Sequence, residues 1–290
     1  MKTLLIGADG QLGTDLGKVY SADELIPLTI EDIDVCDHAE VNRILRERSP
    51  EVVINTAAYH RVDECEDHPE KAMEVNALAV RNLAVICREI DAILVHFSTD
   101  YVFDGEASEP YTERDTPRPL SAYAISKLAG ELFVRYLHDR HFVVRLCGLY
   151  GVTGSKEKGT NFVETMIKLA EEGTDIKVVS DQTLTPTYTG ALAPRIKALI
   201  GTGQYGLYHM TCEGECSWYD FARAIFELSG LTPNLSPTTS DIYRTPAKRP
   251  RYSVLENENL KSATAVPPMP FWRDALKEYL EERTQRRSGS

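Results

Sequence analysis

Tyr123 and Lys127 stand four positions apart, shortly after the turn-forming segment 117–119. On a helix, residues with this spacing lie on one face, so the phenol and the ammonium would project together. A phenol has a pKa of about 10 and is a weak proton donor at neutral pH. A fixed ammonium stabilises the phenolate, so we expect the pKa of Tyr123 to be lowered toward the working range. The pair is typical of a positioned acid, but an aromatic side chain beside a solvated lysine has the same spacing.

A glycine-rich turn joins the short apolar run 2–6 to the helix-compatible stretch 14–20. Its residues Gly7, Gly10, Gln11, Leu12 and Gly13 follow the pattern Gly-x-x-Gly-x-x-Gly. Strand, glycine turn and helix in this order are the context of a dinucleotide fingerprint. The first glycine would permit the tight turn, the second would let the backbone approach a pyrophosphate, and the third would let helix and strand pack closely. The pyrophosphate would lie at the helix N-terminus; an ordinary glycine turn is the alternative.

An apolar, strand-length run at 93–97 ends in Ser98, Thr99 and Asp100. In an open parallel sheet, ligands bind beyond the carboxyl ends of the strands. A hydroxyl at this position could therefore hydrogen-bond a substrate oxygen beside the tyrosine. Taken alone, a Ser-Thr pair at a strand end more often caps a helix or forms a turn. Together with the first two features, it predicts a reductase site served by a nicotinamide cofactor.

Apolar runs alternate with helical periodicity through the first half of the chain. The expected strands are 25–28, 52–55, 93–97 and 142–145, and the expected helices are 39–48, 69–89 and 121–138. This alternation predicts an α/β fold with a Rossmann-type, doubly wound parallel sheet. We expect a dinucleotide-binding domain at 1–150, to which some later chain returns. A smaller C-terminal substrate lobe would span 151–285, beginning with the polar loop 151–160, and residues 286–290 would form a flexible tail.

The composition limits the partners of the protein. Forty-four acidic against 32 basic residues give a net charge of −12, which disfavours nucleic acids and anionic membranes as partners. No run of 18 apolar residues occurs, and the chain begins directly with a strand, so we expect a cytoplasmic protein. The Cys212-x-x-x-Cys216 pair has no second pair or histidine at zinc spacing, and we expect no metal site.

Further motifs give the chain a resemblance to one family. They include 55–63 with Glu66, 75–77, Ser98-Thr-Asp-Tyr-Val-Phe-Asp-Gly105, Gly130-Glu131, Asn161-Phe162, Asp181-Gln182, Pro186-Thr187, and Arg249-Pro250 followed by Ser253 and Leu255. With the glycine turn and the Tyr/Lys pair, this set resembles the dTDP-4-dehydrorhamnose reductase family of the extended short-chain dehydrogenase/reductase superfamily. The glycine and Tyr/Lys motifs are shared across the superfamily, whereas the others are narrower.

The resemblance implies NADPH- or NADH-dependent reduction of the 4-keto group of dTDP-4-dehydro-6-deoxy-L-mannose to dTDP-L-rhamnose. Tyr123 would protonate the emerging alkoxide, Lys127 would hold the nicotinamide ribose, and Thr99 would bind the keto oxygen. This agrees with the need for a donor positioned before oxyanion charge develops. Ala57, Ala58 and Tyr59 would line the nicotinamide ribose. The expected substrate contacts are Val62, Thr99, Asp100, Tyr101, Asn161, Gln182 and Arg249.

Several of these residues have a second interpretation. Asp34 and Val35 could contact the adenine or simply form a polar loop. Thr29 stands where an acid would bind a ribose 2′-hydroxyl, so we expect the enzyme to accept both NADH and NADPH. Arg249 could bind a diphosphate through its guanidinium fork or be a solvated surface charge. Asp63, with Glu66, fits a helix cap or an ion pair better than a catalytic role.

The chain also departs from some relatives. Gly148 replaces a tryptophan that would lie against the sugar. Asp15 matches one of the glutamates that bind interface magnesium in some relatives, but its co-ligands are not identified. We expect a monomer or a homodimer. A 4,6-dehydratase would need Asp-Glu after the threonine, whereas Tyr101 follows Asp100, and an epimerising reductase would place a cysteine beside that hydroxyl. The alternatives that stay open are a reductase of another nucleotide-linked 4-keto sugar and a regulatory subunit similar to the methionine adenosyltransferase β subunit.

Overall fold

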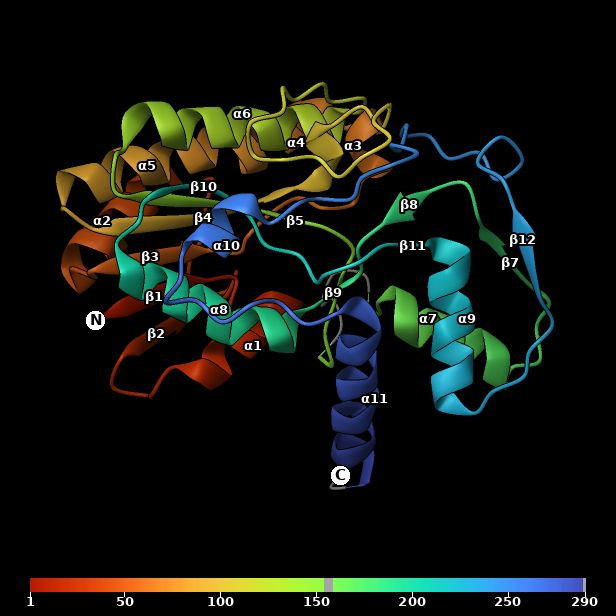
Figure 1. The fold of residues 1–290 in the computed structure, drawn as a ribbon. Coiled ribbons are helices and arrows are strands. Elements are labelled where there is room, and N and C mark those ends of the chain that lie inside the picture. The colour runs from red at the N-terminus through yellow and green to blue at the C-terminus, as the bar shows by residue number, and fades with distance from the viewer. Residues whose placement is uncertain (154–158, 289–290) are drawn as a thin grey trace.

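A parallel sheet of six strands forms the centre of the computed structural model, which describes residues 1–153 and 159–288 (Figure 1). Its spatial order is β10-β5-β4-β3-β1-β2, and every neighbouring pair is parallel. The strands are β1 (Thr3–Ile6), β2 (Leu25–Leu28), β3 (Val52–Asn55), β4 (Ile93–Thr99), β5 (His141–Leu146) and β10 (Gly206–His209). Each of the four inner strands β1, β3, β4 and β5 is buried along its whole length, as expected when helices cover both faces.

Helices lie on both faces of this sheet. Figure 1 shows α2 (His38–Arg48), α5 (Ala79–Glu89) and α6 (Ala122–Leu137) on one face, with α1 (Gln11–Val19) and α8 (Thr189–Thr202) on the other. Alternate residues of a strand point to opposite faces, and accordingly Leu4 and Ile6 pack in the cluster under α2 and α5, whereas Leu5 packs in the cluster under α1 and α8. The doubly wound α/β fold predicted from the sequence is confirmed.

The stretch 69–89, expected as one helix, is divided into three. It consists of α4 (Pro69–Met73), a π-helical turn η1 (Glu74–Leu78) and α5. A π-turn inserts an extra residue into the helix and shifts the side chains around it. Here the turn contains Asn76, a fully buried amide whose contacts are described below.

The second half of the chain forms a smaller group of elements at one end of the sheet (Figure 1). It contains α7 (Phe162–Glu171), α9 (Trp218–Ser229), α11 (Trp272–Ser288), the parallel pair β7 (Ile176–Val179) and β12 (Leu235–Thr238), and the short strands β6 (Leu149–Tyr150), β8 (Thr183–Leu184), β9 (Thr187–Tyr188) and β11 (Cys216–Ser217). Two short elements, α3 (Glu64–Asp67) and α10 (Glu258–Ser262), and the 3-10 turn η2 (Asp100–Val102) complete the fold. Chain returns to the large sheet as α8 and β10, while the division of the chain at residue 150 stays a prediction.

The C-terminal helix differs from the sequence-based expectation. Residues 286–288, predicted as part of a flexible tail, belong to α11, and 289–290 lie outside the described residues. Arg286 lies 3.8 Å from Glu282 one turn earlier, a spacing that supports helix. Of the polar loop predicted at 151–160, residues 154–158 are likewise outside the described part of the chain.

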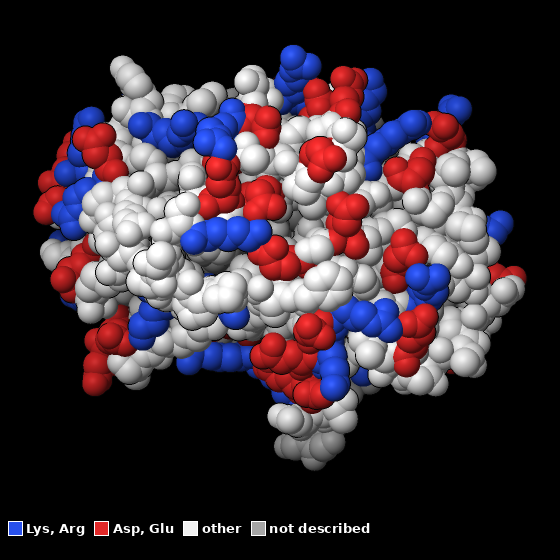
Figure 2. All heavy atoms as spheres, viewed as in Figure 1, with Lys and Arg blue, Asp and Glu red and all other residues white. Residues whose placement is uncertain are grey.

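The surface carries both signs of charge. Acidic and basic side chains are interspersed over the face in Figure 2 rather than gathered into one field of a single sign. Among the described residues, no helix is both long enough and apolar enough to cross a bilayer.

Candidate functional site

A large pocket opens at the carboxyl ends of β1, β3 and β4. The order β2-β1-β3 means that the chain passes to opposite sides of β1, and a crevice at such a switch point is where open α/β sheets bind ligands. The pocket has a volume of about 1430 Å³. Its walls are the glycine turn, the loops after β2, β3, β4 and β5, and side chains of the smaller group of elements, including Thr165, Trp218 and Arg249.

Two of the three glycines in the turn are required by the fold itself. Gly7 has φ +77, and a Cβ there would lie 2.6 Å from Thr56 Oγ1. A Cβ on Gly13 would lie 2.1 Å from the Gly7 carbonyl oxygen, so only glycine lets α1 pack this closely on the turn. Gly10 is different, because its Cβ would meet only the Gly7 oxygen, at an ordinary 3.4 Å. The packing of the described residues therefore leaves room at Gly10 on the side where a ligand would approach.

The N-terminus of α1 is open to the pocket. Gly10 is its N-cap, and among the described residues no side chain caps the helix and no acid occupies its first turn. Gln11, Leu12 and Gly13, which follow Gly10, all line the pocket. Unpaired N–H groups at a helix N-terminus favour an anion such as a pyrophosphate. The glycine turn thus leaves an open helix N-terminus on the pocket, and binding of a dinucleotide there stays a prediction.

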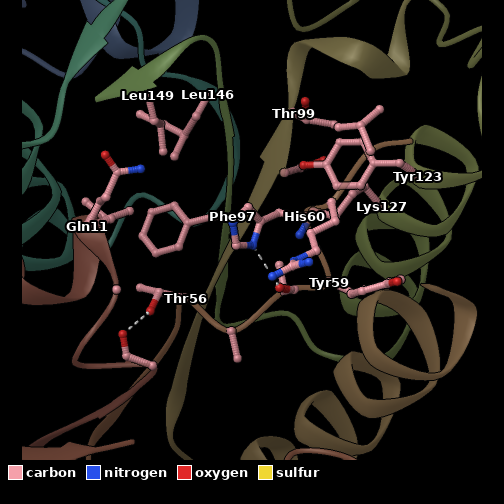
Figure 3. Close-up of a pocket in the computed structure, with 18 of the residues that line it drawn as sticks. Gln11, Thr56, Tyr59, His60, Phe97, Thr99, Tyr123, Lys127, Leu146 and Leu149 are labelled. Carbon is pink, nitrogen blue, oxygen red and sulfur yellow. Dashed lines mark hydrogen bonds between the residues drawn. The ribbon is translucent and has the colours of Figure 1, made fainter. Parts of the chain in front are cut away.

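The three candidate catalytic residues come together on one wall of the pocket. Tyr123 and Lys127 project from the first turns of α6, which begins where the Ser121 hydroxyl accepts a hydrogen bond from Ala124 N at 3.3 Å. Thr99 ends β4, the strand beneath this helix. Figure 3 shows the side chains of Thr99, Tyr123 and Lys127 gathered on one side of the pocket, opposite Gln11 of the glycine turn. The sequence predicted this grouping from two segments that are 24 residues apart.

The protonation behaviour of Tyr123 differs from the expectation. Burial, followed by the charge of Asp100, raises the pKa of the phenol, while a hydrogen bond with Thr99 opposes the rise. Lys127 is not among the groups that shift this pKa, so the expected acidification by Lys127 is wrong for the protein without ligands. The result still suits a proton donor, because a raised pKa keeps the phenol protonated through the neutral range.

Lys127 is buried, and burial lowers its pKa to about 8 although the charge of Glu131 opposes this effect. Glu131 lies one turn further along α6 and binds Arg145 through two hydrogen bonds, of 2.9 and 2.8 Å. Both partners of this ion pair are fully buried. The Glu131 carboxylate is bonded to Arg145, so among the described residues Lys127 has no salt bridge, and it lines the pocket.

Asp100 was predicted as a substrate contact, but its carboxylate has protein partners. Oδ1 accepts a hydrogen bond of 3.0 Å from the Thr99 hydroxyl, and Oδ2 accepts one of 3.1 Å from the thiol of Cys147. Asp100 is 4% exposed. Burial, and then the Asp100 charge, raise the pKa of the Cys147 thiol, so this cysteine stays protonated. Asp100 therefore orients the Thr99 hydroxyl from behind.

Asn76 has a structural role that its motif, 75–77, did not predict. Its Oδ1 accepts a 2.9 Å hydrogen bond from Tyr59 N, and its Nδ2 donates 3.0 Å hydrogen bonds to Tyr59 O and to Ser126 Oγ. Ser126 lies between Tyr123 and Lys127 on α6. One buried amide thus ties the loop after β3 to the helix that carries the candidate acid; a polar residue inside an apolar helical stretch was the available clue.

The predicted cofactor residues all line the pocket. Ala57, Ala58 and Tyr59 lie on the loop after β3, and Asp34 and Val35 follow β2. Asp34 Oδ1 accepts a 2.9 Å hydrogen bond from Cys36 N, which fits the polar loop predicted as the alternative to adenine contact. At the end of β2, Thr29 N and Oγ1 donate to Asp32 Oδ2 at 2.8 and 3.0 Å. A carboxylate therefore does lie at this strand end, three residues later than expected.

The predicted substrate residues also line the pocket, but the side chains of some of them bind other parts of the protein. Val62 and Tyr101 flank the catalytic wall, and Tyr101 packs edge-on against Tyr123 with ring centroids 6.2 Å apart. Asn161 caps α7 and binds Gly151 O at 2.8 Å, so its amide holds a loop. Gln182 Nε2 donates to Ser240 Oγ at 2.9 Å. Direct contact of these residues with a ligand stays a prediction.

Gly148 and Asp15, the two departures from relatives, have structural explanations. Gly148 has φ +54, and a Cβ there would lie 2.8 Å from a methyl carbon of Leu184, so this backbone does not accommodate a tryptophan. Asp15 accepts a hydrogen bond from Lys18 at 2.5 Å and another from the Thr189 hydroxyl. The described residues place no cluster of three potential metal ligands there or elsewhere.

Known proteins resemble the chain over its whole length. A family model described as the RmlD substrate binding domain matches residues 1–285. A dTDP-4-dehydrorhamnose reductase from Clostridium acetobutylicum, known as a crystal structure, is 43% identical, with a TM-score of 0.92 and coverage of 98% of this chain and 100% of the other. The Bacillus anthracis dTDP-4-dehydrorhamnose reductase, solved in complex with NADP, is 37% identical, with a TM-score of 0.92 and coverage of 97% and 100%.

A third relative has a different name. The dTDP-4-keto-6-deoxy-D-glucose reductase of Streptomyces niveus is 37% identical over 277 residues, which are 94% of each chain. The glycine turn, the Thr99/Tyr123/Lys127 wall and the late Arg-Pro segment lie within the matched region. The resemblance predicted from the sequence is confirmed, and the chain belongs to the dTDP-4-dehydrorhamnose reductase family.

Proposed function

We propose that the protein reduces the 4-keto group of dTDP-4-dehydro-6-deoxy-L-mannose to give dTDP-L-rhamnose, with NADPH or NADH as the reductant. The observation that carries this proposal is the geometry of one pocket. An open helix N-terminus that suits a pyrophosphate lies on one side, and a phenol, a hydroxyl and an ammonium lie together on the other. A dinucleotide laid between them would bring its nicotinamide to the catalytic wall.

When bound, the reduced nicotinamide supplies a hydride to the carbonyl carbon. The electron pair of the carbonyl π bond moves to the keto oxygen, and the Tyr123 Oη–H bond breaks to give that oxygen its proton. The product is a secondary alcohol, and the phenolate regains a proton from solvent. Asp100 holds the Thr99 hydroxyl in place beside Tyr123, and Lys127 would hold the nicotinamide ribose.

Support for a dual cofactor comes from the end of β2. Thr29 lines the pocket where an acid would bind the ribose hydroxyl, and its N–H and hydroxyl bind Asp32, which does not itself line the pocket. A carboxylate favours a ribose hydroxyl over a 2′-phosphate, yet a relative 37% identical to this chain carries NADP. We propose that both cofactors are used.

The sugar is the least constrained part of the proposal. A relative at 37% identity is named for a different 4-keto sugar, and Gly148 leaves the sugar region without an aromatic side chain at that position. Reduction of another nucleotide-linked 4-keto sugar is therefore the second candidate. A purely regulatory subunit is disfavoured by the assembled Thr99, Tyr123 and Lys127. We place the activity in the cytoplasm, where nucleotide sugars and nicotinamide cofactors are found, with the protein acting as a monomer or a homodimer.

The test is a panel of nucleotide-linked 4-keto sugars with purified protein and NADPH. Cofactor oxidation gives the rate, and NMR of the product gives the configuration at carbon 4. The proposal expects the highest kcat/KM with dTDP-4-dehydro-6-deoxy-L-mannose and an L-rhamnose product. Faster turnover of another sugar would support the second candidate, and no turnover of any member would leave only the regulatory alternative.

A further inference from the structure

The segment 245–251, called the strap here, links the smaller group of elements to the cofactor-binding part of the chain. Its Arg249 forms a two-pronged ion pair with Asp63, which precedes it by 186 residues: Nη1 lies 3.0 Å from Oδ1 and Nη2 lies 2.9 Å from Oδ2. The same Oδ1 accepts a 3.1 Å hydrogen bond from Ala247 N. The side chain of Arg249 is 20% exposed, so the pair is partly shielded from solvent.

The hydrogen-bond donors of Arg249 divide into two edges. A guanidinium has five N–H donors, two on each Nη and one on Nε. The two Nη1 donors are shared among Asp63, Thr245 Oγ1 and Ala247 O, and one Nη2 donor is taken by Asp63. The Nε donor and the second Nη2 donor lie together on the opposite edge. Two parallel N–H groups of this kind match the oxygens of a phosphate.

Arg249 also borders the pocket, and the Tyr101 phenol is within hydrogen-bonding reach of its guanidinium. Tyr101 in turn packs edge-on against Tyr123, with the ring planes 86° apart. Asp63 itself does not line the pocket, although its neighbours Val62 and Glu64 do. The carboxylate therefore reaches the pocket through the strap, which it binds at Arg249 and at Ala247 N.

A second contact fixes the strap independently of this ion pair. Gly105, in the loop that follows Tyr101, has φ +79, and a Cβ there would lie 2.7 Å from Pro250 Cα and 2.6 Å from Arg251 N. The Asp-Gly and Arg-Pro motifs of the sequence are thus packed directly on each other. The strap is held from two sides, and the orientation of the Arg249 side chain depends on Asp63.

We infer that Asp63 is a positioning residue for the nucleotide sugar: it fastens one edge of the Arg249 guanidinium so that the other edge receives a diphosphate oxygen beside Tyr101. This inference rests on the proposed function and assigns the diphosphate end of its substrate. Asp63 follows the loop 57–62, which lines the cofactor part of the pocket. Through Asp63, the arginine that would bind the substrate is attached to the cofactor-binding part of the chain.

The opposite view is that Asp63 competes with the diphosphate for Arg249. The two views predict opposite changes when the carboxylate is removed. If Asp63 positions Arg249, replacing Asp63 leaves the guanidinium mobile and weakens substrate binding, because a mobile arginine must be ordered again on binding. If Asp63 competes, its loss releases the full charge of Arg249 and strengthens binding.

The experiment uses Asp63→Asn, Arg249→Met and the double variant, with Glu227→Gln as the matched control. Glu227 pairs with Arg273 at 2.7 Å between α9 and α11 and does not line the pocket. Steady-state kinetics with NADPH and dTDP-4-dehydro-6-deoxy-L-mannose give KM and kcat, and fluorescence titration gives the Kd of NADPH. Melting temperatures report any loss of folding.

For Asp63→Asn we expect KM for the sugar nucleotide to rise about tenfold with kcat and the NADPH Kd nearly unchanged, as for an arginine fork that is no longer held. The double variant should have the KM of Arg249→Met alone, since Asp63 acts through Arg249. The Glu227→Gln enzyme should match wild type. An unchanged or lowered KM in Asp63→Asn, or additive effects in the double variant, would overturn the inference.

Failure of the proposed function gives a different pattern. If wild type does not turn over this sugar nucleotide, the same variants are compared by calorimetric titration of the NADPH-loaded protein with dTDP alone. Weaker dTDP binding by Asp63→Asn than by wild type would support the role of Asp63 in holding Arg249, even when the reaction does not occur. Equal binding by the two proteins, or no binding by wild type, would overturn the inference.

Discussion

Replacing Lys127 by methionine should make the ligand-free protein more stable at neutral pH. Burial holds the pKa of Lys127 at about 8 in the folded protein, against 10.5 for a free lysine side chain. Each tenfold change in proton affinity is worth ~1.4 kcal/mol, so keeping this ammonium charged in the fold costs roughly 3 kcal/mol. Methionine has a similar length and carries no charge. Such a cost is expected where function requires a charged group in a buried site.

The pH dependence gives the sign of this effect. Below pH 8 both folded and unfolded wild type carry the proton, so the full cost is present. As pH rises from 8 to 10.5, the folded protein loses the proton first, and the cost falls toward zero. Urea denaturation of both proteins at pH 7 and pH 10.5 measures the difference. We expect Lys127→Met to unfold at a higher urea concentration at pH 7, with little difference at pH 10.5. A variant that is less stable than wild type by the same amount at both values would refute the electrostatic argument.

Further predictions concern the cofactor and the glycine turn. Values of kcat/KM for NADH and NADPH should be comparable, and a preference beyond about a thousandfold for either would contradict the proposal that both cofactors are used. Gly13→Ala should abolish NADPH binding or folding, because its Cβ would lie 2.1 Å from Gly7 O. The control Gly17→Ala, whose Cβ would have nothing within 4 Å, should bind NADPH normally and gain about 1 kcal/mol of stability. Equal behaviour of the two variants would argue against the packing role of Gly13. The kcat/KM of wild type should fall as pH rises above about 8, where free enzyme loses the Lys127 proton, and this limb should be absent in Lys127→Arg because arginine stays charged.

The fold followed from local patterns in the sequence. The runs 52–55 and 25–28 are strands with the predicted bounds, because short apolar segments between helical stretches have few other ways to be buried. The helix over 69–89 was predicted in position but not in form, since the π-turn that places Asn76 depends on contacts with Tyr59 and Ser126. Such contacts join distant segments and leave no mark in local periodicity.

The candidate site followed from spacing, but its electrostatics did not. Tyr123 and Lys127 lie on one face of α6 as their spacing predicts. The pKa of Tyr123 depends instead on burial and on Asp100, whose carboxylate binds Cys147 in the loop after β5. The partner of Arg249 could not be predicted from the sequence either, because Asp63 lies 186 positions away. Charges and burial at a site come from tertiary packing, so a motif alone gives the chemical groups without their protonation.

The central claim is that Tyr123 donates the proton in a nicotinamide-dependent ketone reduction. Its most direct test is kcat of Tyr123→Phe beside Tyr150→Phe, which removes a buried hydroxyl without a hydrogen-bond partner among the described residues. With NADPH and dTDP-4-dehydro-6-deoxy-L-mannose, the account predicts that Tyr123→Phe loses about a hundredfold or more in kcat while NADPH still binds, and that Tyr150→Phe keeps the wild-type rate. A Tyr123→Phe enzyme that turns over as fast as wild type would contradict the account.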